Sequence, residues 1–297
     1  MMKLARLAPV LVVLPLLLGG CNLIRSWSGN AEDLEEKTDY AKIPPEQIYS
    51  NGIDALNGKR YETAIRQFDA IEQYYPYSSW TTPAQLMRGY AEYQRGHYTD
   101  AIGALDRFIQ LHPNNRDTPY AYYLRALCYY EQISDIQRDQ QNTQLAMSAL
   151  QEVVNRYPES TYARDARLKI DLCRDHLAGK EMEVGRWYQR MKQYQAAIGR
   201  FQRVVDEYQT TNHTPEALSR LTEIYLALGM VDEAKRTASV LGYNYPGNEW
   251  YKHSWDQLVR DNDASRVVQG GGAAGPASPQ APDSDQGFFA RTWHSLF

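Results

Sequence analysis

The sequence predicts an all-α fold, a right-handed α-solenoid of about five helix-turn-helix repeats that ends in a capping helix. Three observations predict it. An alanine, called the anchor below, recurs five times at separations of 37, 45, 51 and 37 residues. A residue that is bulky and apolar in four of the five copies follows one helical turn later, and a pair similar to Tyr-Pro begins eleven residues after the anchor. The anchors are Ala64, Ala101, Ala146, Ala197 and Ala234.

The second helix of each repeat accounts for this spacing. A small side chain lets two helices approach closely, a bulky one fills the groove between them, and proline ends the helix. Twelve residues before the anchor, three repeats have Gly52, Gly89 or Gly185, where the first helix of a tetratricopeptide (TPR) repeat also requires a small residue. These offsets predict TPR repeats over residues 44–262.

The first residues have the pattern of a bacterial lipoprotein signal. Lys3 and Arg6 precede an apolar run over 7–18, which is too short to span a bilayer and is followed by Gly19-Gly20-Cys21. Small residues before a cysteine are what the lipoprotein signal peptidase requires, so we predict a signal peptide over 1–20 and lipidation of Cys21. An ordinary secretory signal that contains a cysteine is the alternative. Asn22 stands where aspartate would retain the protein in the inner membrane, which favours the periplasmic face of the outer membrane.

The other segments are predicted in chain order. Polar, acidic residues over 21–43 predict a flexible tether, and Pro44-Pro45 opens the first repeat. An insertion in the third repeat predicts a surface loop at 134–143. Residues 162–191 predict one extended helix with Leu168, Leu172 and His176 on one face. Aromatic and apolar residues over 250–259 predict the cap, followed by a flexible linker over 263–287 and an amphipathic aromatic tail over 288–297.

Charge and motifs argue against nucleic-acid binding and catalysis. The net charge is −4, and removal of Lys3 and Arg6 with the signal changes the count to 30 − 36 = −6, which implies no basic surface for nucleic acid. The six histidines lack the paired spacing of a metal site, and no nucleophile or phosphate-binding motif occurs. We expect no enzyme activity, no cofactor and no metal. For Cys128 and Cys173, two buried thiols are the preferred interpretation and a disulfide is the alternative.

The first helices of stacked TPR pairs line the concave side, so their outward positions predict a groove. In the first three repeats these positions are mostly tyrosines, which suit an extended peptide with aromatic side chains. In the last two repeats they are charged. The alternative is that several of the tyrosines only pack between repeats. The predicted peptide-binding residues are Tyr49, Tyr90, Tyr93, Tyr120, Tyr123 and Arg125, and the charged positions of the last two repeats include Arg186, Arg190, Arg220 and Glu223.

Several stretches resemble the BamD family, the TPR lipoproteins of the machinery that inserts β-barrel proteins into the outer membrane. The resemblance runs from the lipoprotein signal to about Trp255. The matching stretches are Asp106-Arg107-Phe108-Ile109 with Pro113, Arg138-Asp139-Gln140, Arg156-Tyr157-Pro158, residues 177–182 with Gly185-Arg186, and Glu216-Ala217-Leu218 with Arg220-Leu221. Gly179-Lys180-Glu181 together with the long tail resembles the alphaproteobacterial branch.

The resemblance implies a scaffold with two tasks. The N-terminal repeats would receive unfolded outer-membrane β-barrel proteins through their aromatic-ended C-terminal signal. The C-terminal repeats would hold the POTRA region of a BamA-type barrel subunit and other small Bam lipoproteins, and Arg200 would communicate with that subunit. This makes the charged positions of these repeats the predicted docking residues, namely Arg186, Arg190, Arg220 and Glu223. The sequence alone leaves a second interpretation, a TPR lipoprotein that scaffolds cell-wall or division enzymes.

The aromatic tail has two interpretations. As a helix, it places Phe289, Trp293, Leu296 and Phe297 on one face, suited to a partner or a membrane. As a strand, it would end in Phe297 like a barrel signal and occupy the groove of the protein itself. The helical interpretation is favoured because strand alternation would place Arg291 and Ser295 beside Phe289 and Phe297.

Overall fold

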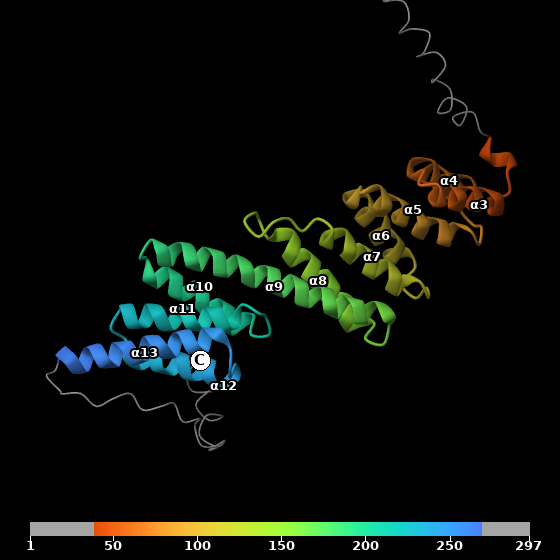
Figure 1. Ribbon diagram of the computed structural model, residues 1–297. Coiled ribbons are helices and arrows are strands. Elements are labelled where there is room, and N and C mark those ends of the chain that lie inside the picture. The colour runs from red at the N-terminus through yellow and green to blue at the C-terminus, as the bar shows by residue number, and fades with distance from the viewer. Residues whose placement is uncertain (1–38, 269–297) are drawn as a thin grey trace, which may run out of the picture. The chain divides into compact units, whose positions relative to one another are not determined.

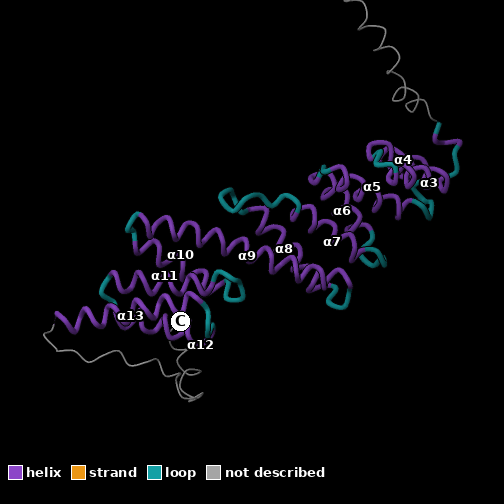
Figure 2. The backbone as a smooth tube through the Cα atoms, viewed as in Figure 1, coloured by secondary structure: helices purple, strands orange, loops and turns teal. Residues whose placement is uncertain are grey.

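The computed structural model describes residues 39–268, which form helices joined by turns, with no strand in this range (Figure 1 and Figure 2). The signal peptide, Cys21, most of the tether and of the linker, and the aromatic tail lie outside the described residues. No helix in the described part is long and apolar enough to cross a bilayer. The predicted all-α repeat fold is confirmed.

The chain divides into two compact units, Met1–Lys180 and Glu181–Phe297. The described part of the first unit consists of η2 (Tyr40–Lys42), α3 (Pro45–Asn57), α4 (Tyr61–Tyr74), α5 (Thr81–Arg95), α6 (Tyr98–Leu111), α7 (Thr118–Tyr130), α8 (Gln141–Arg156) and the larger part of α9 (Thr161–Arg190). The second contains the end of α9, α10 (Tyr194–Glu207), α11 (Thr214–Ala227), α12 (Val231–Asn244) and α13 (Glu249–Val268). Helices that follow each other in the chain pack against each other within each unit.

In three repeats, the glycine twelve residues before the anchor and the bulky residue after the anchor form one helix–helix contact. If the glycine carried a β-carbon, that atom would lie closer to the bulky side chain than two non-bonded carbon atoms normally come. The bulky side chain is fully buried in the close-packed core, so it has no room to move away. In the fifth repeat the sizes are exchanged, because the buried residues at the two positions are Thr222 and Ala238. The closest distances to the added β-carbon are 2.6 Å for Gly52 and Phe68, 2.9 Å for Gly89 and Leu105, and 2.6 Å for Gly185 and Phe201.

The turn inside four of the repeats places a left-handed residue five positions before the anchor. The φ angles are 56° at Lys59, 81° at Gly96, 59° at Lys192 and 73° at Gly229. The next backbone N–H then donates to a carbonyl of the preceding helix, as His97 does to Glu92 over 3.0 Å. Glycine adopts this conformation without steric cost, whereas lysine does not.

Replacing Lys59 or Lys192 with glycine should therefore stabilise the protein. We expect each substitution to raise the free energy of unfolding by about 0.5–1 kcal/mol, because relief of left-handed strain exceeds the added entropy of the unfolded chain. The measurement is urea unfolding of the full-length lipoprotein in detergent. The reverse change at the equivalent position, Gly96→Lys, serves as the control and should lower stability. A loss of stability in both lysine variants would contradict the argument.

A repeated hydrogen bond occurs at three of the four junctions between repeats. The residue that ends the second helix offers its carbonyl to a hydroxyl at the start of the following first helix. Proline follows Tyr75 and His112 but not Tyr208, and the bond forms in all three cases, so proline is not required for this junction. The bonds are Thr81 Oγ1 to Tyr75 O at 2.7 Å, Thr118 Oγ1 to His112 O at 2.7 Å, and Thr214 Oγ1 to Tyr208 O at 3.0 Å.

The long helix α9 is confirmed, but Leu168 and Leu172 do not face the core. Their exposed fractions are 63% and 57%. The buried stripe of this helix instead follows Ala166, Ile170 and Cys173 at spacings of four and three residues, and Leu168 falls between these positions. The two leucines thus share an exposed face.

Both ends of the repeat domain differ from the sequence-based expectation. Residues Tyr40 to Ile43, expected in the solvated tether, are held by the Tyr75 hydroxyl, which lies 2.8 Å from the Ile43 carbonyl oxygen. In the cap, Ser254 is buried and donates to the Ser219 hydroxyl over 2.9 Å, whereas Trp255 is 42% exposed. The cap helix α13 also continues to Val268, because the sequence has no glycine or proline between residues 248 and 269.

The two cysteines are free buried thiols, as the preferred interpretation held. Cys128 on α7 and Cys173 on α9 belong to one apolar core. Burial raises the pKa of the Cys128 thiol to about 12 and that of Cys173 to about 11, so both remain protonated and unreactive at neutral pH.

Candidate functional site

Five half-buried tyrosines from α5, α7 and α9 lie close together in the first unit. They are Tyr90, Tyr93, Tyr120, Tyr123 and Tyr162, and are called the tyrosine row. The Tyr162 ring centroid lies 5.5 Å from that of Tyr120 and 5.4 Å from that of Tyr123. Tyr120 is also near enough to Tyr90 and Tyr93 for their charges to influence its pKa. The structure thus brings four predicted groove residues together and adds Tyr162, which the sequence argument missed.

The hydroxyls of Tyr90, Tyr93 and Tyr123 in the tyrosine row form hydrogen bonds with neighbouring side chains. Burial raises the pKa of Tyr93 to about 12, and the nearby Glu131 carboxylate, to which Tyr93 donates over 3.4 Å, adds to the increase. Burial also raises the pKa of Tyr123, whose hydroxyl donates to Asp165. Tyr90 accepts a hydrogen bond from Gln94 Nε2 over 2.9 Å. The row therefore offers apolar ring faces with uncharged polar edges, which suits a neutral aromatic ligand.

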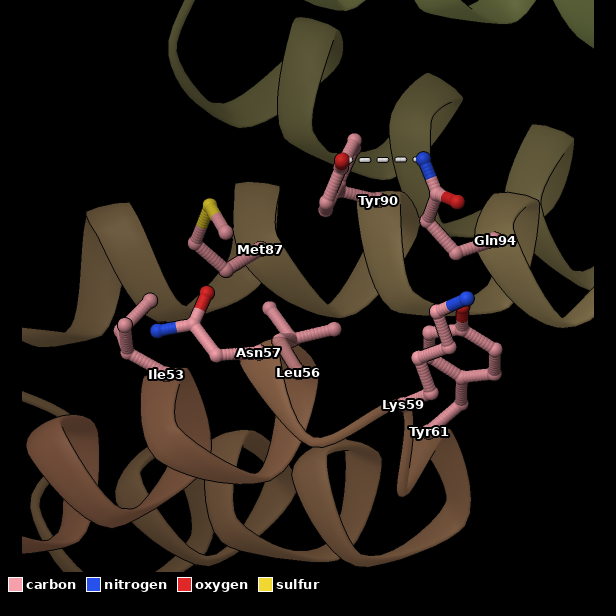
Figure 3. Close-up of a pocket in the computed structure, with 8 residues that line it drawn as sticks. All are labelled: Ile53, Leu56, Asn57, Lys59, Tyr61, Met87, Tyr90 and Gln94. Atoms are coloured by element: carbon pink, nitrogen blue, oxygen red, sulfur yellow. Dashed lines mark hydrogen bonds between the residues drawn. The ribbon is translucent and has the colours of Figure 1, made fainter.

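A pocket of about 230 Å³ adjoins the row at Tyr90. Figure 3 shows side chains of α3 facing Met87 and Tyr90 of α5 across the pocket. Ile53 of α3 lies on its wall. The volume and the mostly apolar wall can receive a side chain but not a whole folded partner. The lining residues are Ile53, Leu56, Asn57, Lys59, Tyr61, Met87, Tyr90 and Gln94.

Two predicted groove residues have structural contacts away from the row. The Tyr49 ring lies 5.0 Å from that of Trp80 and 5.7 Å from that of Phe68, within the packing of the first repeat. Arg125 Nη1 lies 2.7 Å from Asp106 of α6, and Nη2 lies 2.5 Å from Glu152 of α8, so Arg125 bridges two second helices. Through these ion pairs Arg125 joins α6 and α8 to α7. Arg125 is not part of the tyrosine row.

Three predicted docking residues belong to one charged network in the second unit. Arg186 pairs with Glu216 at 3.1 Å, Arg220 lies between Glu216 and Glu223 at 3.4 and 3.0 Å, and His253 lies 2.8 Å from Glu223. Glu216 and His253 were not predicted as members, because their contacts bridge α9, α11 and α13, which sequence spacing does not reveal. Arg190 is exposed and lies at the end of α9.

The Glu223 carboxylate should make the second unit sensitive to acid. Burial raises its pKa, but hydrogen bonds from His253, Gln189 and Arg220 outweigh burial and hold the pKa below its ordinary value of 4.5. A group whose pKa is lowered by folding contributes stability above its unfolded pKa, and this contribution is lost as the pH falls through the folded pKa. We expect the free energy of unfolding to fall more steeply below pH 4.5 in the wild type than in Glu223→Gln.

Denaturant unfolding from about pH 3 to about pH 7, a range that includes the usual carboxyl pKa of about 4, measures this difference. The control is Glu249→Gln, which changes an exposed carboxylate of the same unit. Equal slopes for the wild type and Glu223→Gln would contradict the prediction.

Arg200 is paired within its own unit. Its Nη1 atom lies 3.0 Å from Glu181 Oε2, and Arg203 Nη1 lies 3.0 Å from the other oxygen of the same carboxylate. The Glu181 side chain is 13% exposed, whereas the Arg200 side chain is 37% exposed. Glu181 thus joins α9 to α10 through two arginines, and Arg200 retains an accessible edge. Arg200 belongs to this cluster rather than to the network around Glu223.

The comparisons with known proteins agree with this architecture. A family model described as "Outer membrane lipoprotein" (YfiO) matches residues 41–241. The outer membrane protein assembly factor BamD of Caulobacter vibrioides is 50% identical over 230 residues, which cover 77% of this chain and 75% of that protein. The chain belongs to the BamD family. BamD of Rickettsia prowazekii is 44% identical over 262 residues, covering 88% of this chain and 99% of that protein.

The family assignment confirms the resemblance found in the sequence and favours it over a cell-wall scaffold. Among solved structures, the TPR domain of P58(IPK) is similar with a TM-score of 0.38 and 16% identity, covering 75% of this chain and 66% of that chain. The TPR protein TTC0263 of Thermus thermophilus is similar with a TM-score of 0.34 and 18% identity, covering 76% of this chain and all of that chain (100%).

Proposed function

We propose that this BamD-family protein is a non-enzymatic scaffold of the β-barrel assembly machinery, anchored by lipid on Cys21 at the periplasmic face of the outer membrane. Its tyrosine row and the adjoining pocket receive unfolded β-barrel proteins. Its charged second unit holds the POTRA region of a BamA-type subunit and other small Bam lipoproteins. Support for the assembly role comes from the BamD relatives and the outer-membrane lipoprotein family.

The observation that carries the substrate proposal is the tyrosine row beside a pocket of side-chain size. Outer-membrane barrel strands alternate apolar and polar residues and carry aromatic girdles, so an unfolded barrel segment presents aromatic rings at regular intervals. Rigid tyrosines bind such rings at little cost in rotamer entropy, and the pocket at Tyr90 can hold one terminal ring. The tyrosine hydroxyls can also form hydrogen bonds with the backbone of the bound peptide.

A peptide-binding assay tests this role. A fluorescent peptide with alternating aromatic residues and a C-terminal phenylalanine is titrated with the full-length lipoprotein in detergent, and anisotropy is measured. We expect Tyr90→Ser to weaken binding by about tenfold, which is the usual cost of losing one aromatic anchor. Tyr77→Ser is the matched control, because the Tyr77 side chain is fully exposed outside the row. Equal losses in both variants, or none in Tyr90→Ser, would argue against the tyrosine row.

Purification from the native envelope tests the assembly role separately. The lipoprotein is captured in detergent and its partners are identified by mass spectrometry. A dominant outer-membrane barrel protein with periplasmic POTRA domains supports the proposal. Dominant peptidoglycan synthases would instead favour the cell-wall scaffold.

A further inference from the structure

Glu92 is a buried acid at a position where comparable repeats have none. Nine residues before the anchor, the first, fourth and fifth repeats have Ala55, Tyr188 and Tyr225. In the second repeat this position is Glu92, whose side chain is only 7% exposed. Its Oε2 atom accepts no hydrogen bond from the part of the chain that the structure describes. Buried carboxylates are normally paired or bound to metal, so this oxygen lacks the partner that its burial requires.

The arginines on the same helix are engaged elsewhere. Arg88 Nε lies 2.6 Å from Asp69 Oδ1, and Arg95 Nη1 lies 2.6 Å from Glu62 Oε2. Both carboxylates belong to α4. Both arginines near Glu92 are therefore already paired with carboxylates other than Glu92.

Two further ligand-type side chains face Glu92 across this turn. His97 precedes α6 and Asp100 lies in its first turn. The His97 Nδ1 atom lies 3.9 Å from Glu92 Oε2 and 3.6 Å from Asp100 Oδ2. One ligand atom from each residue lies within 4.8 Å of the others. Ligand atoms around a tetrahedral Zn²⁺ are about 3.3–3.6 Å apart, given bonds of about 2.0–2.2 Å.

We propose that Glu92, His97 and Asp100 bind a divalent transition-metal ion, with Zn²⁺ preferred. A neutral imidazole and two carboxylates supply a charge of −2 that matches the ion, and water completes a tetrahedral shell. The imidazole selects against Ca²⁺ and Mg²⁺, which take oxygen ligands. His97 and Asp100 are 46% and 63% exposed, so their side chains can rotate toward an ion that the buried Glu92 holds in place.

The bound ion would fasten the last turn of α5 to the first turn of α6 across Gly96. Tyr93 of the tyrosine row is adjacent to Glu92, and its ring lies 5.9 Å from that of Tyr98, the first residue of α6. Metal binding would thus stiffen the helix pair that carries Tyr90 and Tyr93. The spacing of the histidines in the sequence predicted no metal site. A site with one histidine and two carboxylates does not require a pair of histidines, so this spacing does not reveal it.

Calorimetry on the full-length lipoprotein tests the site. The protein, purified without a polyhistidine tag and stripped with EDTA, is titrated with ZnCl₂, and its unfolding temperature is measured with and without the ion. We expect one Zn²⁺ per chain and a higher unfolding temperature, because the ion binds only the folded turn. Even outer-shell substitutions reduce metal affinity about 10–100-fold, so Glu92→Gln and His97→Gln should weaken binding at least about tenfold.

The control is His253→Gln. His253 lies 2.8 Å from the Glu223 carboxylate, but among the described residues it belongs to no group of three possible metal ligands. Its zinc affinity should equal that of the wild type. Unfolding of each variant without metal separates loss of the site from loss of the fold, and Glu92→Gln preserves the side-chain size. Absent zinc binding in the wild type, an equal loss in His253→Gln, or Ca²⁺ binding as tight as Zn²⁺ binding would each overturn the assignment.

Discussion

Replacing Phe201 with alanine is expected to lower the free energy of unfolding of the second unit by about 3–5 kcal/mol, the usual cost of a large core truncation. The side chain is fully buried and fills the space that Gly185 leaves on α9. Because the surrounding structure relaxes only in part after such a truncation, a cavity remains between α9 and α10. Urea unfolding of the full-length lipoprotein, followed by circular dichroism, measures the loss.

The same contact should also reject a larger residue at position 185. A β-carbon there would lie 2.6 Å from Cε1 of Phe201. We expect Gly185→Ala to cost about 1–3 kcal/mol through overpacking. The double variant Gly185→Ala, Phe201→Leu should lose less than the sum of the single losses, because the smaller ring-free side chain leaves room for the added methyl group.

Gly199 provides the matched control. It lies within α10, two residues from Phe201, and a β-carbon there would meet no atom within 4 Å. Gly199→Ala should stabilise the protein by about 0.5–1 kcal/mol, because alanine has the higher helix propensity. A comparable loss at positions 185 and 199 would show that glycine is needed for backbone reasons rather than for this contact.

The repeats were predictable because the same kind of helix–helix contact recurs at fixed offsets in the sequence. The anchor, the bulky residue and the glycine are each weak signals, but their fixed offsets place them in one contact, as Gly52 and Phe68 show. The sequence placed Leu168 and Leu172 on one face but did not show that this face is exposed, because only the neighbouring helices reveal which stripe of α9 is buried.

The charged and aromatic sites were predictable only in part. Counting from the anchor identified Tyr90, Tyr93, Tyr120 and Tyr123, since these share one helix face in successive repeats. The same counting placed Arg125 beside the tyrosines, whereas its long side chain reaches Asp106 and Glu152 on other helices. Such contacts depend on the direction and length of the side chain as well as on its position in the repeat. The spacing of residues in a single sequence does not reveal that direction.

Arg200→Glu is expected to reduce capture of the BamA-type subunit by about tenfold or more, as for loss of a central arginine in an interface. Arg200 presents an accessible edge while it pairs with Glu181. The substitution leaves Glu181 paired with Arg203, so the contact between α9 and α10 is retained. The effect should therefore fall on the partner rather than on the fold. Quantitative mass spectrometry of partners captured from the native envelope measures it.

Arg203→Glu makes the same charge change against the same carboxylate, one helical turn further along α10. Because each variant replaces an arginine beside the Glu181 carboxylate with a second carboxylate, both should lose stability, and by a similar amount. If Arg200 contacts the partner directly, Arg203→Glu should retain most of the captured subunit. Equal loss in both variants would place the effect in the Glu181 cluster as a whole. Full capture by Arg200→Glu would remove Arg200 from the docking surface, leaving the network around Glu223 as the remaining charged candidate.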